Sequence, residues 1–172
     1  MTNELPAPQG LYDPAFEKDA CGVGCIVQKN GERSHQIVIQ GLQILKNLQH
    51  RGSAGEDSLA GDGAGIVTQL PHAFFKKVTA RLFIELPDEE EYAVGMVFLP
   101  KEEEQRRMCQ DSIEKIVDNE KEKFLGWRKV PCDNSCLSQR LLPLEPFIYQ
   151  FFIQRTEADH ESFERKLYLV RR

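Results

Sequence analysis

The chain has 172 residues, 41% of them hydrophobic and 28% charged, which is typical of a globular protein long enough to bury one core. Its 22 Lys and Arg residues against 27 Asp and Glu residues give a formal net charge of −5 at pH 7. The acidic balance argues against a nucleic-acid surface, and the lack of a membrane-length apolar stretch argues against a membrane partner.

Residues 1–20 predict an extended leader rather than a packed element. Prolines and a glycine lie among polar residues without any periodicity. The segment is too acidic for a signal peptide or an Arg-rich transit peptide, so we expect a cytoplasmic protein.

The run from Cys21 to Gln28 predicts the first strand, with Val23, Cys25 and Val27 on one face. Five cysteines without a secretory leader favour reduced thiols. The pairs Cys21-x3-Cys25 and Cys132-x3-Cys136 also admit a zinc interpretation. Four strand rises, about 13 Å, would however separate the first pair too widely for one metal ion or a disulfide.

A helix is expected next, capped by Ser34, and Gly52 is expected to end it in a left-handed conformation. Its predicted inward stripe is Ile37, Val38, Gly41, Leu42, Leu45 and Leu48. Residues 52–65 form a glycine-rich loop that ends in a short strand around 66–67. The loop matches neither G-x-x-x-x-G-K-[ST] nor G-x-G-x-x-G, so phosphate binding is disfavoured.

The rest of the chain alternates helices and strands. We expect a helix opened by Pro71 with Phe74, Phe75, Val78 and Leu82 inward, a strand at 92–99 buried on both faces, a helix at 101–124, strands at 126–130 and 147–153, and a helix at 159–172. By element order alone, this alternation suggests a parallel α/β sheet.

Cys21 lies where the leader meets the first strand. A free cysteine is more often a small, inert core residue, and its spacing alone favours that interpretation. If residues 1–20 are removed, however, the α-amine of Cys21 becomes a base beside its own thiol. With a pKa near 7.7–8, against about 10.4 for lysine, this amine suits proton transfer at neutral pH. Gly22 and Gly24 would let substrate and backbone approach the sulfur closely.

Several motifs occur in an order that resembles the start of the glutamate synthase large subunit. They are L-Y-D-P-A-F-E-K-D-A-C-G-V-G, L-Q-H-R-G, G-D-G-A-G-I, Q-L-P-H-A-F-F, G-W-R-K-V-P-C-D-N-S, P-F-I-Y-Q-F-F-I and F-E-R-K-L-Y. The resemblance runs from about Leu11 to the last residue. Each motif alone is of moderate specificity, whereas the ordered set is highly specific.

The resemblance implies a glutamine amidotransferase domain of the N-terminal nucleophile hydrolase class. Its fold would be α+β, here a partial four-layer αββα sandwich with two antiparallel sheets. Residues 1–20 would be a propeptide and residues 21–172 the N-terminal part of the domain. Cys21 would attack the carboxamide of L-glutamine and form a thioester, and Arg51 and Gly52 would bind substrate or support the nucleophile.

The same resemblance places FMN and an iron–sulfur cluster in the remaining synthase domains, with no cofactor or metal in this segment. Those domains would be partners that receive ammonia through a tunnel. Two family features, an oxyanion Asn-Gly pair and an H-S-R-F-S-T-N-type stretch, do not match at Asn30-Gly31, Asn134-Ser135 or elsewhere. We therefore expect a truncated domain that is inactive alone. A non-catalytic binding fragment, or another class II amidotransferase with a different ammonia acceptor, stays open.

Overall fold

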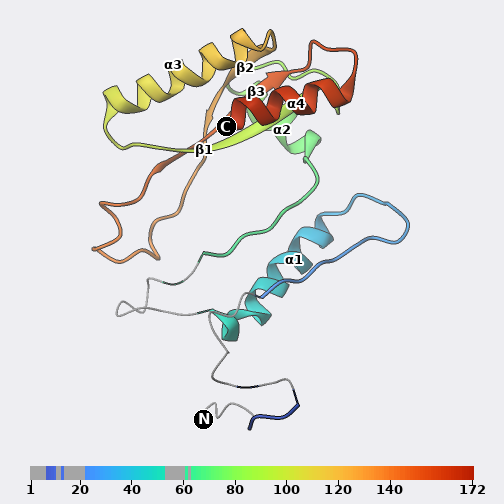
Figure 1. Cartoon of the computed structure of the whole chain (residues 1–172), viewed down its shortest axis with the longest axis vertical. Helices are drawn as coiled ribbons and strands as arrows, with labels where there is room; N and C mark the ends of the chain where they lie inside the picture. Colours follow the sequence, from blue (N-terminus) through green and yellow to red (C-terminus); the bar gives the residue numbers. More distant parts are fainter. Residues whose placement is uncertain (1–6, 11–12, 14–21, 53–60, 62) are drawn as a thin grey trace. The chain divides into compact units, whose positions relative to one another are not determined.

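Four α-helices and three strands form in the part of the chain that the computed structural model describes, namely residues 7–10, 13, 22–52, 61 and 63–172 (Figure 1). They belong to two units, Met1–Gln69 and Leu70–Arg172. The predicted leader, residues 1–20, lies largely outside the described residues, as does Cys21.

Helix α1, His35–Asn47, is the main element of the first unit. The Ser34 hydroxyl oxygen accepts a hydrogen bond from the Gln36 N–H at 3.1 Å, so the predicted cap is confirmed. The inward stripe was wrong at one position, because Leu42 is 46% exposed and Ile44 is half-buried in its place. The helix therefore turns a slightly different face inward than the spacing predicted.

Three local predictions in this unit are wrong. Residues 22–28 are not a strand, because they pair with no strand in the described part of the chain. Val23 and Val27, predicted to lie on one face of this strand, are 87% and 83% exposed. Residues 66–67 also form no strand. Gly52 has φ −84° and ψ 154°, an extended rather than left-handed conformation, because the short 3-10 helix η2, Gln49–Arg51, follows α1 and ends there.

The second unit contains an antiparallel sheet of β1, Tyr92–Leu99, β2, Lys123–Lys129, and β3, Phe147–Gln154, in the order β1-β3-β2. Strand β3 pairs with both neighbours, from Tyr92 opposite Gln154 to Leu99 opposite Phe147 on one side. The parallel sheet suggested by element order is wrong. Helix α3 connects two strands that run the same way, but β3 inserts between them, as in a split βαβ unit.

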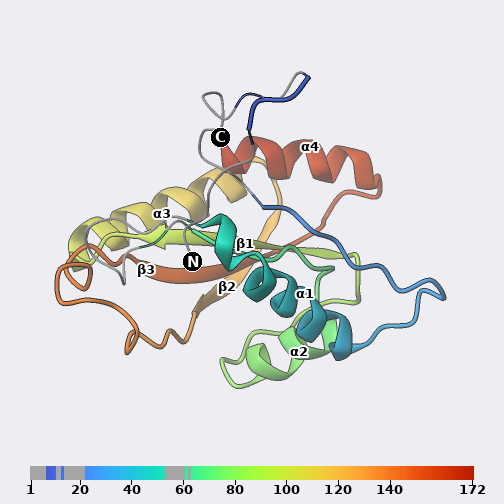
Figure 2. The ribbon, with the colours of Figure 1, turned by 90° about the horizontal axis from the view of Figure 1, so that it is seen from below.

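Helices α3, Glu103–Asn119, and α4, His160–Arg171, cover one face of this sheet (Figure 2). The core on that face is formed by Val117, Phe151, Ile153 and Phe163. Helix α2, His72–Ala80, opens after Pro71 as predicted and contributes to a second core on the other face. That core is formed by Phe75, Ile84, Tyr92 and Phe152. The described part of the chain is therefore a mixed α+β structure.

The second unit also corrects four predictions. Helix α3 ends at Asn119 rather than at 124, because Lys121 has φ +61°, and Phe124 belongs to β2 instead. Strand β1 is buried at its ends but not on both faces, since Phe98 is 67% exposed. Phe74 and Leu82, predicted to face inward around α2, are 49% and 45% exposed.

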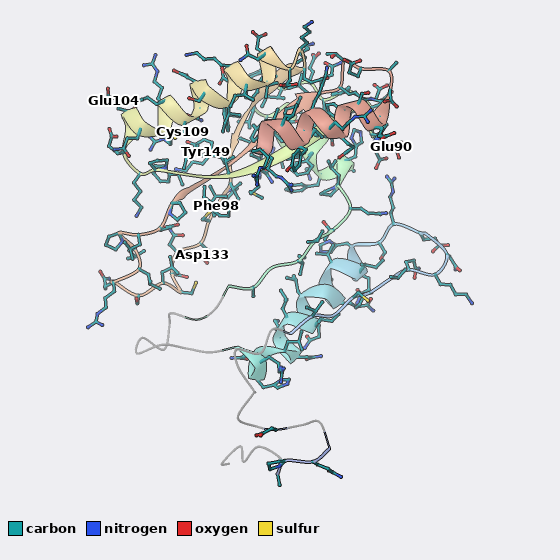
Figure 3. All side chains as sticks on the ribbon, viewed as in Figure 1. Glu90, Phe98, Glu104, Cys109, Asp133 and Tyr149 are labelled. Carbon is teal, nitrogen blue, oxygen red and sulfur yellow. The ribbon has the colours of Figure 1, made fainter. Side chains whose placement is uncertain are left out.

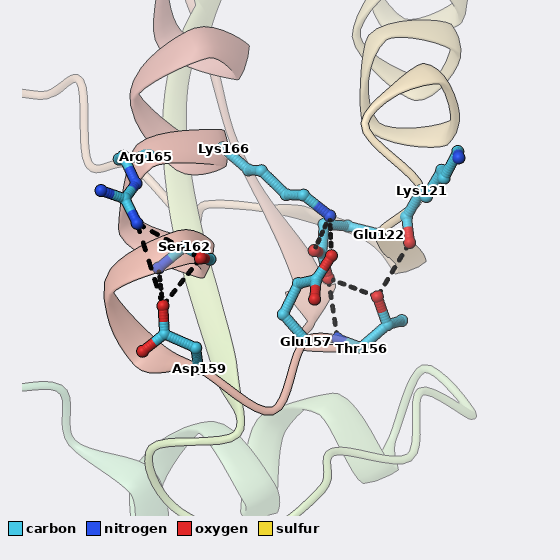
Figure 4. A network of polar contacts seen from close by, with 8 residues as sticks. All are labelled: Lys121, Glu122, Thr156, Glu157, Asp159, Ser162, Arg165 and Lys166. Carbon is cyan, nitrogen blue, oxygen red and sulfur yellow. Dashed lines mark hydrogen bonds and ion pairs between the residues drawn. The ribbon is translucent and has the colours of Figure 1, made fainter.

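A polar cluster joins the end of α3 to the start of α4 (Figure 4). The fully buried Glu122 carboxylate accepts hydrogen bonds from the Thr156 N–H at 2.7 Å and from the Lys166 ammonium at 3.0 Å. Lys166 also contacts Glu157 at 2.6 Å, and these two carboxylates raise the pKa of Lys166, Glu157 most. Because every charge in the cluster has a partner, burial of Glu122 is tolerated.

Asp159 caps α4 beside this cluster. Its carboxylate accepts hydrogen bonds from the Ser162 hydroxyl at 2.7 Å and from the Ser162 N–H at 2.9 Å. These bonds to Ser162 hold the pKa of Asp159 below its usual value. The predicted start of the last helix is therefore confirmed by a local cap.

Tyr92 should make the stability of the second unit sensitive to alkaline pH. Burial, with a smaller contribution from Glu89, raises the pKa of its phenol from 10.0 to about 12. The folded chain therefore retains a proton that the unfolded chain loses, so stability should fall as the pH rises from about 10 to about 12. Urea unfolding at about pH 9 and about pH 11.5 should show a smaller fall for Tyr92→Phe than for the wild type. Tyr149→Phe serves as the matched control, and an equal fall in Tyr92→Phe would contradict this assignment.

Candidate functional site

The segment that follows Cys21 lies against α1 in the first unit (Figure 1). A Cβ atom added to Gly22 would lie 3.2 Å from a terminal methyl group of Leu48, the residue that ends α1. Gly22, the residue after Cys21, therefore lies beside the C-terminal end of this helix. Of the predicted site residues, Cys21 itself lies outside the described part of the chain.

Gly24 explains why the segment can lie so close to the helix. A Cβ atom at this position would lie only 2.6 Å from Cγ2 of Ile44, closer than two carbon atoms can pack. Gly22 and Gly24 alternate along the segment, and Leu48 and Ile44 lie one turn apart on α1. The two glycines thus form a smooth strip that contacts one row of helix side chains.

Arg51 and Gly52 lie just beyond this contact. The Arg51 N–H donates to the Leu48 carbonyl oxygen at 2.8 Å, and the Gly52 N–H donates to the Gln49 carbonyl oxygen at 3.1 Å. The turn η2 therefore fixes the backbone of Arg51 three residues after the Gly22 contact. No carboxylate among the described residues pairs with its guanidinium, which is exposed. The turn thus carries a cation that has no carboxylate partner among the described residues, and it follows directly on Leu48, the residue nearest to Gly22.

A side chain could fit at Gly52 without local strain. The nearest atom to an added Cβ would be the Gln49 carbonyl oxygen at 3.5 Å, and the backbone is extended. Among described neighbours, nothing local therefore demands glycine at this position. The end of the helix accounts for the backbone position of Arg51, but it does not account for glycine at residue 52.

Sequence reasoning missed the helix residues Ile44 and Leu48 as the platform for Gly22 and Gly24. Two patterns in the sequence could have indicated this contact. Glycine recurs at every second position in the segment, and apolar residues recur one helical turn apart in α1.

Asn30 and Gly31, considered as an oxyanion pair, form a turn in which the Gly31 N–H donates to the Gln28 carbonyl oxygen and Gly31 has φ +69°. That amide is already engaged in the turn.

The other candidate groups, the free thiols and possible metal ligands, do not gather into a site in the described part of the chain. Cys25, Cys132 and Cys136 are exposed free thiols, and no group of three or more His, Cys, Asp or Glu side chains in the described ranges could hold a metal ion. Two open hollows of about 690 and 650 Å³ lie in the second unit, and neither is lined by Arg51 or Gly52. Asp133 lines no site, and a hydrogen bond from the Ser135 N–H lowers the pKa of its carboxyl.

Gly24→Ala should separate the strip from α1. The added methyl group would have to displace Ile44, at a cost of about 1–3 kcal/mol in unfolding free energy. Gly41→Ala is the matched control, because its Cβ would meet nothing within 4 Å and alanine favours a helix by about 0.5–1 kcal/mol. Urea unfolding of both variants measures the difference. Equal stability of the two variants would show that the Gly24 contact has no energetic role.

A family model and several known proteins match this chain over most of its length. The family model for class-II glutamine amidotransferases matches residues 21–172. The chain is 42% identical over 172 residues to the NADPH glutamate synthase large chain of Bacillus subtilis, covering 99% of this chain and 11% of that protein. It is 39% identical to the NADH glutamate synthase of Schizosaccharomyces pombe, covering 98% and 8%, and 33% identical to the ferredoxin-dependent glutamate synthase of Pyropia yezoensis, covering 100% and 11%. The chain thus spans about a tenth of the length of these relatives.

No helix in the described part of the chain has the length and apolar character that a membrane crossing requires.

Proposed function

The chain belongs to the class-II glutamine amidotransferases, and we propose that it performs the glutamine-hydrolysing half-reaction of a glutamate synthase. One observation carries this proposal: the family match begins at Cys21, and the similarity to glutamate synthases of three electron-donor types extends over nearly the whole chain. Residues 1–20 are then a leader, and residues 21–172 form the N-terminal part of an amidotransferase domain within a longer protein.

In the proposed reaction, removal of the leader makes Cys21 the N-terminal residue. Its α-amine takes the thiol proton, and the thiolate adds to the carboxamide carbon of L-glutamine. The carbon–nitrogen bond breaks, and ammonia leaves with the proton returned by the amine. Water then adds to the thioester, which releases L-glutamate and restores the thiol. The strip of Gly22 and Gly24 against α1 supports this assignment, because it anchors the backbone directly after the nucleophile.

Arg51 and Gly52 are proposed to support the nucleophile or bind substrate. The guanidinium of Arg51 lies on a hydrogen-bonded turn and has no carboxylate partner among described residues, so its donors are available to an anion. A cation near a thiol favours the thiolate, and a guanidinium also pairs well with a carboxylate. The absence of a side chain at Gly52 would leave room for substrate.

The remainder of the longer protein completes the proposed scheme. It would complete the four-layer αββα sandwich, supply the oxyanion donors, and receive ammonia at a site containing FMN and an iron–sulfur cluster, where 2-oxoglutarate is the acceptor. The described residues of this chain offer no cluster of metal ligands, so we assign no step of that chemistry to it.

N-terminal sequencing and glutaminase assays of the full-length protein test this function. Fully active protein should begin at Cys21, release ammonia from glutamine, and form a second glutamate from 2-oxoglutarate when an electron donor is supplied. Fully active protein that retains residues 1–20 would overturn the N-terminal mechanism. Ammonia release without any use of 2-oxoglutarate would instead identify an amidotransferase with another acceptor.

A further inference from the structure

The second unit contains a hollow of about 690 Å³ at the end of its sheet where β2 leaves and β3 enters. Residues 130–146 connect these two strands without a helix or strand, and Figure 3 shows Asp133 on the part of this connection that projects beyond the sheet. The charged, amide and aromatic side chains that line the hollow are Lys101, Lys129, Asn134, Glu145 and Phe147. Its volume lies within the range of about 300–1,000 Å³ that is typical of small-molecule sites.

Hydrogen bonds hold the walls of this hollow in place. The Val130 N–H donates to the Ile148 carbonyl oxygen at 2.9 Å, which joins the two ends of the connection. Within the connection, the side-chain amide of Asn134 donates to the carboxylate of Glu145 at 2.8 Å, which joins its two arms. A ligand would therefore not have to order the connection, and this lowers the cost of binding.

Two lysine ammonium groups of the hollow have unused donors. The Nζ atom of Lys129 lies 4.4 Å from the centre of the Phe147 ring and has no hydrogen bond or ion pair among the described residues. The ammonium of Lys101 donates to the Leu142 carbonyl oxygen, which uses one of its three N–H donors. Neither lysine forms an ion pair with a described carboxylate. Both can therefore donate to an anion in the hollow.

A third cation lies close to the same aromatic ring. The guanidinium carbon of Arg106 on α3 is 4.7 Å from the centre of the Phe147 ring, and its Nη1 atom donates to the Lys101 carbonyl oxygen at 2.7 Å. No described carboxylate forms an ion pair with Arg106 either. Because Arg106 and Lys129 repel each other beside one ring, an anion in the hollow would lower the electrostatic energy of the group.

Glu145 provides the opposite charge within the hollow. Its side chain is half-buried, and its Oε2 atom accepts the hydrogen bond from Asn134, whereas Oε1 has no partner among the described residues. Glu145 forms an ion pair with neither Lys101 nor Lys129. The hollow thus combines two available cations with one carboxylate that can still accept from a cation.

We propose that this hollow binds L-glutamate, with the two carboxylates of the ligand on Lys101 and Lys129 and its ammonium group on Glu145. An amino dicarboxylate carries two anionic groups and one cationic group, which is the reverse of the charges that line the hollow. The inference rests on the proposed function only in the choice of L-glutamate among such amino acids, because the proposed reaction releases it. None of these three residues has a role in the proposed hydrolysis.

The charge pattern separates L-glutamate from related ligands. A phosphate group would bring its negative charge next to the half-buried Glu145 and offer this carboxylate no donor of positive charge. Glutarate has both carboxylates of L-glutamate but lacks the ammonium group, so it also leaves Glu145 unpaired. L-Glutamine carries a neutral amide in place of the second carboxylate, so one of the two lysines loses its charged partner.

Isothermal titration calorimetry of L-glutamate into the 172-residue chain and into the full-length protein tests this site. We expect saturable binding to both, with a Kd about tenfold higher for glutarate and for inorganic phosphate. In the full-length protein, L-glutamate can also bind as a product where glutamine is hydrolysed. The site to be counted there is the one that substitution of Lys129 weakens.

Two substitutions assign the binding to this hollow. Lys129→Gln should raise the Kd for L-glutamate about tenfold, since it removes the partner of one carboxylate. Glu145→Gln should remove most of the difference between L-glutamate and glutarate, while its side-chain oxygen can still accept from Asn134. Lys123→Gln is the matched control, because Lys123 is the exposed first residue of β2 and does not line the hollow. Circular dichroism of each variant checks that the sheet still forms.

Absence of saturable L-glutamate binding to the full-length protein would overturn the proposal, even if the 172-residue chain alone bound it. An unchanged Kd in Lys129→Gln would also overturn it, because L-glutamate would then bind elsewhere. Phosphate binding as tight as that of L-glutamate would identify a general anion site instead. Ammonia release from glutamine is measured on the same wild-type protein. Lost binding with intact release would contradict this inference alone, whereas intact binding without release would contradict the proposed function alone.

Discussion

Cys21→Ala should abolish ammonia release from glutamine by the full-length protein, while synthesis from added ammonia remains largely intact. Alanine keeps the α-amine but removes the sulfur, so no thioester can form. Loss of a nucleophile typically lowers kcat by about 10⁴-fold or more. Glutaminase and ammonia-dependent rates are measured on the same preparation.

Two controls separate the nucleophile from the other thiols. Cys25 and Cys136 are exposed, and serine at either position should leave the glutaminase rate within about twofold. If the ammonia-dependent reaction fell together with the glutaminase reaction in Cys21→Ala, the assignment of two separate sites would be wrong. If Cys25→Ser were as inactive as Cys21→Ala, the nucleophile would have been misassigned.

Glu122→Ala should lower the unfolding free energy of the second unit more than removal of Glu157 does. The side chain is fully buried, and its removal leaves the Thr156 N–H and the Lys166 ammonium without their buried acceptor. Removing one partner from a buried charge pair costs about 3–5 kcal/mol in unfolding free energy. Urea unfolding of the 172-residue chain, followed by Trp127 fluorescence, measures this cost.

Glu157→Ala is the matched control for this experiment. Glu157 contacts the same Lys166, but its side chain is 44% exposed. We expect a cost of at most about 1 kcal/mol, because exposed ion pairs contribute little. If both variants lost at most about 1 kcal/mol of unfolding free energy, the buried ion pair of Glu122 would contribute no more to stability than an exposed one. A large cost for Glu157→Ala alone would identify that residue as the main partner of Lys166.

Elements with a local start signal were predictable from the sequence. Ser34, Pro71 and Asp159 each precede a helix that begins at the next residue, because caps and proline act through neighbouring backbone. Strand β1 was predicted with its bounds, Tyr92–Leu99, because its apolar residues form a continuous run. Phe147–Gln154 was predicted to within one residue at its C-terminal end.

Features that depend on distant partners were not predictable in this way. Residues 22–28 have the composition of a strand, but a strand forms only where a second strand pairs with it. The insertion of β3 between β1 and β2 likewise cannot be read from the element order, which is the same for a parallel sheet. In the candidate site, too, local features were predictable and tertiary contacts were not. The position of Arg51 at a helix end followed from local pattern, whereas the contact of Gly24 with Ile44 is tertiary.

The strand order has a consequence for synthesis of the chain. Strand β3 is the last of the three to be made, yet it is the centre of the sheet and pairs with both others. While the ribosome makes residues 92–146, β1 and β2 have no strand to pair with in this sheet, and the nascent chain exposes the uncharged run Y-A-V-G-M-V-F-L. Both ladders can be completed only after Gln154 has left the exit tunnel, so assembly of the sheet is a late, non-local step. During that interval, a chaperone that binds apolar segments would protect β1 from pairing with other nascent chains.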